Sequence, residues 1–597
     1  MLTLVFAFNT QAEVSDPHSF ANFNDVVVKH IDLDLNVDFK QSILKGSATL
    51  SYQNLKQVDQ LILDTRDLTI HQITSAGKPV EYQLAAADKN LGRALTIDIS
   101  KANGSITVEY QTSPDASGLQ WLTPEQTAGK KQPFLFSQAQ AIHARSFIPL
   151  QDTPSARVTY KANIKTPKNL LAVMSASNDP DTQRDGDYYF DMPQAIPSYL
   201  IAIAVGDLTF EAIGDRTGVY SEPSMLAASV KEFEDTQAML EVTEKMYGKY
   251  RWDRYDLLIL PPSFPFGGME NPRLSFITPT VIAGDKSLVS LIAHELAHSW
   301  SGNTVTNASW RDLWLNEGFT TYLTYRIMEV IYGSERFDME ALLGYQSLQH
   351  DLSVLGEPDQ RLTIDLTGRD PDDVFSDIPY EKGALFVREL EHLVGRKNFD
   401  QFLMNYFEDF AFESIDTETF LAYIDKKLIK PYKLDNKRIE QWIYQPGLPV
   451  DHAIPKSNAF TLVDNGRANW LSGNVVAKEL VTSNWTVHQW LHFLNNMPET
   501  MNKSQLDDLD AAFNLTSSSN NEIAHSWLMI AVRNNYQAAW PRLEQYLLSI
   551  GRNKLVKPLY QSLSKTKAGK AFGKRVFNQA KSGYHPLTVK ANERFFK

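Results

Sequence analysis

The spacing of apolar residues changes once along this chain, and that change limits the folds open to it. In residues 30–39 apolar and polar residues alternate strictly, with three aspartates and an asparagine on the polar face. Such alternation is typical of an antiparallel strand with one solvated face. After about Leu208, apolar residues recur instead with helical spacing. The sequence therefore predicts a multidomain α+β protein that begins with an antiparallel β domain.

Shorter patterns place the domain boundaries. Further strands are expected at 61–63, 95–99 and 106–110, and helices around 287–300, 310–332 and 383–394. The stretch QPGLPVDHAIPK holds three prolines and a glycine, which disfavour any continuous element. Beyond it, helical spacing with short connections is consistent with an α-helical solenoid. We expect a β domain at 13–206, a helix-rich domain at 207–446, a linker at 447–458 and a helical domain at 459–597.

Bulk composition excludes several classes of function. At 597 residues the chain is too long for one core, and with 43% hydrophobic and 22% charged residues it resembles a soluble globular protein. The net charge of -13 argues against nucleic acid as a partner. We see no run of about 18 apolar residues, so no membrane insertion is expected. Because the chain has no cysteine, any metal site must use His, Asp and Glu.

The first twelve residues form a signal-like segment, apolar at positions 2–8 but without a basic start. A signal truncated at its front would make the protein exported, periplasmic or secreted. An ordinary strand-forming or irregular start would leave it cytoplasmic. The sequence favours neither interpretation.

The chemistry centres on His294-Glu295-Leu296-Ala297-His298, within a predicted helix. Residues four apart project from nearly the same helix face, so the two imidazoles can bind one ion. Catalytic zinc takes three protein ligands and a water. Eighteen residues separate His298 from Glu317, which lies in the next predicted helix and supplies the third ligand. We therefore expect one Zn²⁺ per chain.

Glu295 follows the first ligand and is expected to point beside the metal. There a carboxylate can take a proton from a water whose pKa zinc lowers to about 7, and pass it to a leaving amine. Asp285 and Ser287 are available to cap the start of this helix. The alternative, two histidines on an ordinary helix, would leave Glu295 as a solvated carboxylate.

Upstream lies PFGGMENP, which contains Gly267, Gly268 and Met269. Two adjacent glycines let another backbone come close, and the extended segment after them could pair with a peptide by strand addition. A tight turn followed by an exposed acid is the competing interpretation.

Together these motifs resemble the gluzincin aminopeptidases, the family of aminopeptidase N, and most closely the leukotriene hydrolase branch. The resemblance also covers FSQAQAIHARSFIPLQDTPSA, PYEKG, GRNKLVKPL and YHPLT, and so spans essentially the whole chain. It implies a saddle-like β domain, a thermolysin-like zinc catalytic domain and a helical C-terminal domain. It also implies a zinc aminopeptidase that acts on short peptides with a free N-terminus. A monomer or weak oligomer is expected.

The resemblance assigns roles to particular residues. Glu270 would bind the α-amino group, with Gln138 and Gln140 lining the same end of the cleft. Tyr380 would donate a hydrogen bond to the oxyanion of the tetrahedral intermediate. Arg552 and Lys554 would attract the carboxylate of a short peptide.

One position departs from the branch. Its epoxide hydrolases usually carry a tyrosine five positions before the PYEKG tyrosine, where this chain has Phe375. Asp372 occupies the position of the acid that directs water in epoxide opening. Lipid epoxide hydrolysis is therefore kept as a side activity only. A helical scaffold with a dead peptidase domain is the non-enzyme alternative, which the complete set of ligands and base disfavours.

Overall fold

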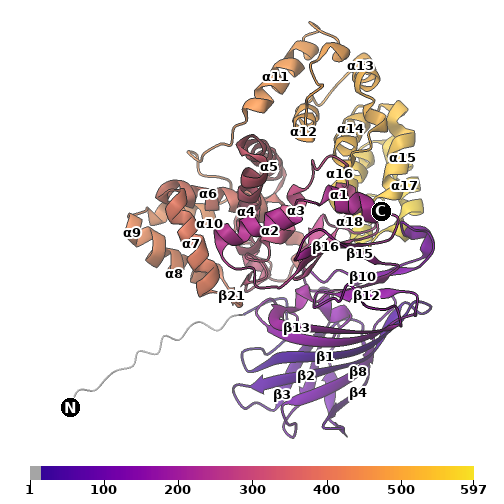
Figure 1. Ribbon diagram of the computed structural model, residues 1–597, viewed down its shortest axis with the longest axis vertical. Coiled ribbons are helices and arrows are strands. Elements are labelled where there is room, and N and C mark those ends of the chain that lie inside the picture. The colour runs from indigo at the N-terminus through magenta and orange to yellow at the C-terminus, as the bar shows by residue number, and fades with distance from the viewer. Residues whose placement is uncertain (1–14) are drawn as a thin grey trace.

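The computed structural model describes residues 15–597. The signal-like segment predicted at 1–12 lies outside these residues. Figure 1 shows three regions: a strand-rich N-terminal region, a central region around helices α2 to α8, and a C-terminal group of helices. Within residues 15–597, none of the helices is long and apolar enough to span a membrane.

The N-terminal β domain is built on a seven-stranded sheet in the order β13-β11-β1-β2-β8-β4-β5. In β1, alternate residues such as Leu33, Leu35 and Val37 are buried, as the alternation predicts. One pairing differs from the expected antiparallel arrangement, because β1 and β11 run parallel. The bounds are β1 (Val26–Asp38), β2 (Ile43–Asn54), β4 (Thr69–Ser75), β5 (Lys78–Pro79), β8 (Ser105–Gln111), β11 (Arg157–Lys165) and β13 (Asp187–Pro197).

Two smaller sheets complete this domain. One has the order β3-β7-β6 and the other β12-β14-β10-β9. Their bounds are β3 (Gln60–Thr65), β6 (Tyr82–Leu84), β7 (Arg93–Asp98), β9 (Leu119–Leu122), β10 (Phe134–Ser137), β12 (Leu171–Met174) and β14 (Ile203–Gly206). The chain leaves β10 directly into the segment that carries Gln138 and Gln140, so this sheet positions both side chains.

The central domain contains a five-stranded sheet that the helical periodicity did not predict. Its order is β15-β16-β17-β19-β18, with β16, β17 and β19 parallel and β18 antiparallel at one edge. The inner strands are short and continuously buried, so they lack the alternation that marks a half-solvated strand. The bounds are β15 (Thr209–Ala212), β16 (Thr217–Ser221), β17 (Tyr255–Ile259), β18 (Gly268–Met269) and β19 (Leu274–Ile277).

Two helices carry the predicted metal ligands. They are α3 (Ser290–Ala297), whose C-cap residue is His298, and α4 (Trp314–Tyr332), and the two helices contact each other. Helix α4 is buried on almost all sides, because further helices surround it. The predicted cap of α3 is wrong: the helix begins at Ser290, and Asp285 instead accepts a hydrogen bond from the Ser287 amide in the preceding turn.

Other helices of the central domain pack around this pair. At one crossing, glycine allows unusually close approach: a Cβ on Gly318 would lie 2.7 Å from the Cα of Gly383. The bounds are α1 (Leu226–Glu232), α2 (Thr236–Tyr247), α5 (Ser334–Val354), α6 (Gly383–Val394), α7 (Arg396–Asp409), α8 (Thr417–Ile424) and α10 (Asn436–Tyr444).

The C-terminal domain is helical, as predicted. Helix α10 ends at Tyr444 and α11 begins at Asn458, so residues 447–457 of the predicted linker lie in neither helix nor strand and its last residue begins α11. Helix α12 contacts α14, α14 contacts α16, and α15 contacts α17. The bounds are α11 (Asn458–Leu471), α12 (Val487–Asn495), α13 (Lys503–Phe513), α14 (Asn521–Arg533), α15 (Trp540–Ser549), α16 (Asn553–Ser564), α17 (Lys567–Ala580) and α18 (Pro586–Glu593). A regular solenoid stays a prediction.

Candidate active site

The three predicted metal ligands converge. The Nε2 atoms of His294 and His298 lie 3.1 Å apart, and Glu317 Oε2 lies 3.3 Å from the first and 3.4 Å from the second. Four tetrahedral ligands at the zinc–nitrogen distance of 2.0–2.1 Å are separated from one another by about 3.3 Å. The three atoms thus already stand at the spacing of one face of a zinc tetrahedron.

Neighbouring groups determine which ring nitrogen of each histidine carries the proton and which carries a free lone pair. His298 Nδ1 lies 3.0 Å from the Ser301 carbonyl oxygen, which can only accept, so Nδ1 carries the proton. The Thr324 hydroxyl donates to the Thr320 carbonyl and leaves a lone pair for His294 Nδ1 at 3.3 Å. When both rings are neutral, their Nε2 atoms therefore present lone pairs to each other and to Glu317. Three acceptors this close need a proton or a metal ion between them, and a donor set of two imidazoles and a carboxylate fits zinc.

The charges around the site also favour a cation. Burial opposes the charged form of His298, yet Glu317, Glu270 and Glu295 together raise its pKa to about 10. For Glu317, burial favours the neutral form, but His298 and His294 lower its pKa to about 2. The same negative potential that holds a proton on His298 would hold a metal ion.

Glu295 is packed against strand β18. Its side chain is 4% exposed, and burial raises its pKa well above the usual value. A Cβ on Gly268 would lie 2.1 Å from Glu295 Oε1, so only glycine leaves room for the carboxylate. The glycine pair thus serves a close side-chain approach, in addition to any approach of a peptide.

Glu270 lies beside the same centre. One ligand atom each from Glu270, Glu295 and His298 lies within 4.8 Å of the others. Asn316 Nδ2 donates to Glu270 Oε1 at 3.4 Å, and Asn303 Nδ2 donates to the Glu270 carbonyl at 2.7 Å. The Glu270 carboxylate is therefore buried and held, and burial raises its pKa.

The β domain reaches this end of the site as predicted. Gln140 Nε2 donates to Glu270 Oε1 at 3.3 Å, and Gln138 Nε2 approaches Met269 Sδ at 3.3 Å. All four side chains are at least 95% buried. The segment after β10 therefore packs against Glu270 and Met269.

Tyr380 lies beside the proposed metal ligand His294. It lies in a π-helical turn, Ile378–Lys382, and its ring stacks on that of His294 with centroids 6.1 Å apart. Burial and the carboxylates of Glu317 and Glu270 raise the pKa of Tyr380 well above its usual value. The phenol therefore stays protonated and can donate a hydrogen bond. Single π-turns of this kind are frequent at functional sites.

The C-terminal domain contributes Arg552 through backbone pairing. The amides on either side of it, Gly551 and Asn553, donate to the carbonyls of Pro262 and Pro265, each at 2.8 Å. A Cβ on Gly267 would lie 2.8 Å from Arg552 Nη2, so the guanidinium lies beside the glycine pair.

The two predicted basic residues differ in setting. Arg552 is 7% exposed, and its Nη1 donates to Glu522 at 3.0 Å and to Thr280 at 3.2 Å. Lys554 is exposed. Lys554 and Arg552 both lower the pKa of Glu522 against the effect of its burial. One acid thus partly offsets the positive charge of this end of the site.

Asp372 is tied to the β domain. Its Oδ2 lies 3.1 Å from His143 Nε2, and its Oδ1 lies 3.5 Å from the Ala141 amide. Burial raises the pKa of Asp372, but His143, together with Lys590 and the Ala141 amide, outweighs burial, and the net shift of this pKa is downward. Phe375 packs on Phe266, with ring centroids 5.9 Å apart.

Comparison with known proteins identifies the family. Residues 27–200 match the Peptidase M1 N-terminal domain, residues 231–442 the Peptidase family M1 domain, and residues 485–595 the Leukotriene A4 hydrolase, C-terminal domain. The chain is 38% identical to leukotriene A-4 hydrolase of Xenopus laevis, over 96% of this chain and 98% of that protein. The chain belongs to peptidase family M1.

Two further relatives agree. Leucine aminopeptidase 2 of Yarrowia lipolytica is 36% identical over 96% of this chain and 92% of that protein. The structure of yeast LTA4 hydrolase in complex with bestatin superimposes with a TM-score of 0.90 at 33% identity, covering 98% of each chain. The family, the three-domain fold and the enzyme class predicted from the sequence are confirmed.

The structure also brings to the site residues whose contacts the sequence motifs did not predict. Asn303 and Asn316 hold Glu270, while Thr320 and Thr324 contact the outer ring nitrogens of the two histidines. All four lie within the stretch from His298 through α4. Asn303 lies in the turn after α3, whereas Asn316, Thr320 and Thr324 are polar residues in the buried helix α4, and that polarity was the available signal. His143, which lies in the quoted FSQAQAIHARSF motif, was missed because its partner is 229 residues away.

Proposed function

We propose that this chain is a zinc aminopeptidase that removes single residues from the N-terminus of short peptides. The observation that carries the proposal is the position of Glu270. One of its carboxylate oxygens lies within 4.8 Å of a carboxylate oxygen of Glu295 and of a ring nitrogen of His298. A buried carboxylate at that place can form an ion pair with the ammonium group of a substrate. An internal peptide segment would leave the carboxylate unpaired. Cleavage one residue at a time follows from that charge.

His294, His298 and Glu317 would hold the zinc, one ion per chain. When bound, zinc supplies a Lewis acid that acidifies water and polarises a carbonyl oxygen. Glu295 accepts the proton of the attacking water and donates it to the leaving amine. Tyr380 donates its phenolic hydrogen bond to the developing oxyanion.

The remaining residues define the substrate. Glu270 and Gln140 bind the α-amino group, and Gln138 with Met269 forms the wall beside the first side chain. Strand β18 lies at the edge of its sheet, so Gly268–Met269 can pair with an extended peptide.

Arg552 and Lys554 attract the carboxylate at the far end of the peptide, which favours short substrates. The name of the Yarrowia relative, leucine aminopeptidase 2, agrees with an aminopeptidase activity for this chain.

The test compares an aminoacyl amide with a free amine against its N-acetylated form. We expect kcat/KM to be higher for the free amine by at least about a hundredfold, because the acetylated substrate leaves the buried Glu270 carboxylate without a cationic partner. In Glu270→Gln this preference should shrink while bound zinc remains stoichiometric. A wild-type enzyme that prefers the blocked substrate would be an endopeptidase.

A lipid epoxide hydrolase is the second candidate, because Asp372 is held as an ionised acid by His143 and because the Xenopus relative is named leukotriene A-4 hydrolase. Phe375 stands where that branch usually has tyrosine. Incubation with a fatty-acid triene epoxide tests it: diol formation no faster than the spontaneous background, and unchanged in Asp372→Asn, would eliminate this activity.

The domain boundaries also remain part of the proposal. We propose a β domain at 13–206, a catalytic domain at 207–446, a linker at 447–458 and a helical domain at 459–597. Helix α10 ends before the linker and α11 begins within its last residue, which supports this division.

A further inference from the structure

The residues that follow Tyr380 in the π-helical turn each reach a different part of the catalytic domain. Glu381 points to α4 and α5, Lys382 points to two backbone carbonyls, and Gly383 touches Gly318. The oxyanion donor assigned above therefore lies at the start of a short segment with three separate attachments.

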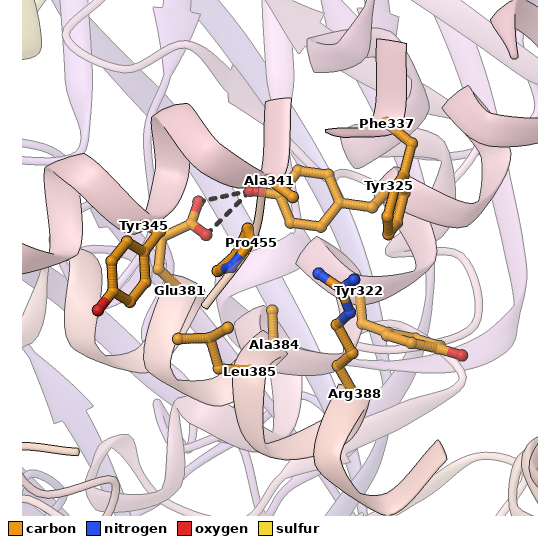
Figure 2. A pocket seen from close by; sticks show the side chains of 10 residues that line it. All are labelled: Tyr322, Tyr325, Phe337, Ala341, Tyr345, Glu381, Ala384, Leu385, Arg388 and Pro455. Carbon is orange, nitrogen blue, oxygen red and sulfur yellow. Dashed lines mark hydrogen bonds between the residues drawn. The ribbon is translucent and has the colours of Figure 1, made fainter. Parts of the chain in front are cut away.

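Glu381 makes the most specific attachment. The Tyr325 hydroxyl lies 2.9 Å from both carboxyl oxygens of Glu381, as the dashed lines in Figure 2 show. A Cβ on Gly344 would lie 2.4 Å from Glu381 Oε2, so α5 leaves a gap that this carboxyl fills. The carboxyl is thus fixed between α4, through Tyr325, and α5, through Gly344.

The surroundings of Glu381 do not resemble a binding site. The cavity that it lines has room for about one water, and apolar side chains such as Phe337 and Leu385 make up much of its wall (Figure 2). Burial and Asp377 raise the pKa of Glu381 to about 8, so the neutral acid predominates at neutral pH. A carboxyl this enclosed, with one hydroxyl as its partner, serves to hold its own backbone in place.

The other two attachments fix the end of the turn. Lys382 is fully buried, and its Nζ donates to the carbonyls of Gln360 at 2.7 Å and Gln445 at 2.8 Å. Gly383 lies against Gly318, the residue after the zinc ligand Glu317. Because the backbone is held from Glu381 to Gly383, the Tyr380 side chain, which stacks on His294, extends from a segment that is fixed directly after it.

We propose that Glu381, through its contact with Tyr325, is a positioning residue for Tyr380: it holds the phenol at the place where the oxyanion forms. This inference rests on the proposed role of Tyr380. Glu381 itself touches neither the ligands nor, by its position behind the turn, the substrate.

Kinetics of five variants test this: Tyr380→Phe, Glu381→Leu, Glu381→Gln, Tyr325→Phe and the double variant Tyr380→Phe/Glu381→Leu. A displacement of about 1 Å at a catalytic group can cost a hundredfold, so we expect Glu381→Leu and Tyr325→Phe to lower kcat by about tenfold to a hundredfold with KM little changed. Glu381→Gln keeps an acceptor oxygen and the shape of the neutral acid, so kcat should stay within about threefold of wild type.

The double variant separates positioning from a general structural role. If Glu381 acts through Tyr380, Glu381→Leu should have no further effect on kcat once the phenolic hydroxyl is gone. Tyr345→Phe is the matched control, because Tyr345 lines the same cavity but its hydroxyl bonds to His452, pointing away from Glu381 in Figure 2. Its kcat should equal that of wild type.

Three results would overturn the inference. They are an unchanged kcat in both Glu381→Leu and Tyr325→Phe, an equal loss from Glu381→Leu with and without the Tyr380 hydroxyl, and a loss in Glu381→Gln as large as in Glu381→Leu. If Glu381→Leu does not fold, Tyr325→Phe with and without Tyr380→Phe gives the same cycle. A full kcat in Tyr380→Phe alone would instead refute the catalytic role of Tyr380 described under Proposed function.

Discussion

Replacing Gly268 by alanine tests the geometry of the proposed general base directly. The added Cβ would lie 2.1 Å from Oε1, 2.3 Å from Cδ and 2.6 Å from Cγ of Glu295. Carbon atoms in contact prefer about 3.5–4.0 Å, so the carboxylate must retreat by more than about 1 Å. The backbone of Gly268 pairs as a regular strand residue, so alanine itself introduces no backbone strain.

The expected loss follows from that displacement. A catalytic group misplaced by 1 Å can cost about a hundredfold, and a general base contributes about 10²–10⁴-fold in all. We therefore expect kcat of Gly268→Ala to fall by about a hundredfold, with Glu295→Gln as the reference for complete loss of the base. The zinc content should remain near one per chain, because the clash does not involve His294, His298 or Glu317.

The assay is release of an aminoacyl chromophore, with zinc measured on the same samples. Gly356→Ala is the matched control: its added Cβ would meet nothing closer than 3.7 Å, at a φ of -67° and ψ of 152° that alanine adopts freely. A Gly268→Ala enzyme within about twofold of wild type would show that Glu295 either is not held against β18 or is not the base.

Two further predictions concern the metal and the far end of the substrate. Chelation should abolish activity, and added zinc should restore it. The variant Thr324→Val removes the oxygen next to His294 Nδ1 and should weaken zinc binding by about tenfold to a hundredfold in a competition titration. A zinc affinity equal to that of wild type would contradict the assigned tautomer of His294. Arg552→Ala, made together with Glu522→Gln so that no buried carboxylate is left unpaired, should raise KM for a tripeptide by about tenfold and leave KM for its C-terminal amide unchanged. Equal changes for both substrates would remove Arg552 from carboxylate binding.

The convergence of the proposed metal ligands could be predicted from the sequence because its geometry is largely local. Positions 294 and 298 share a helix face whatever surrounds the helix, and only the approach of Glu317 depends on packing. Glu270, Tyr380 and Arg552 were predicted through the family resemblance, since no spacing rule joins residues so far apart. Glu270 follows β18, Tyr380 lies in the π-helical turn and Arg552 belongs to the C-terminal domain. Only the folded chain brings these three elements to one site.

What the sequence could not supply was mostly long-range. The parallel pairing of β1 with β11 joins residues more than a hundred positions apart, and nothing in the alternation of either strand selects that partner. The five-stranded sheet was missed because a short, continuously apolar run suits a buried strand and a buried helix equally. Helix α3 starts at Ser290 without a side-chain cap, so the cap rule pointed to the wrong residues.

The backbone pairing around Arg552 has a consequence for how such a cleft changes over time. Gly551 and Asn553 join the C-terminal domain to the Pro262–Pro265 segment through main-chain groups, on either side of the guanidinium. The distance between the proposed amine-binding end and the proposed carboxylate-binding end is therefore fixed by where these two domains are joined. Insertions or backbone shifts at this junction can consequently change the preferred peptide length during evolution, even when every residue that contacts the peptide stays the same.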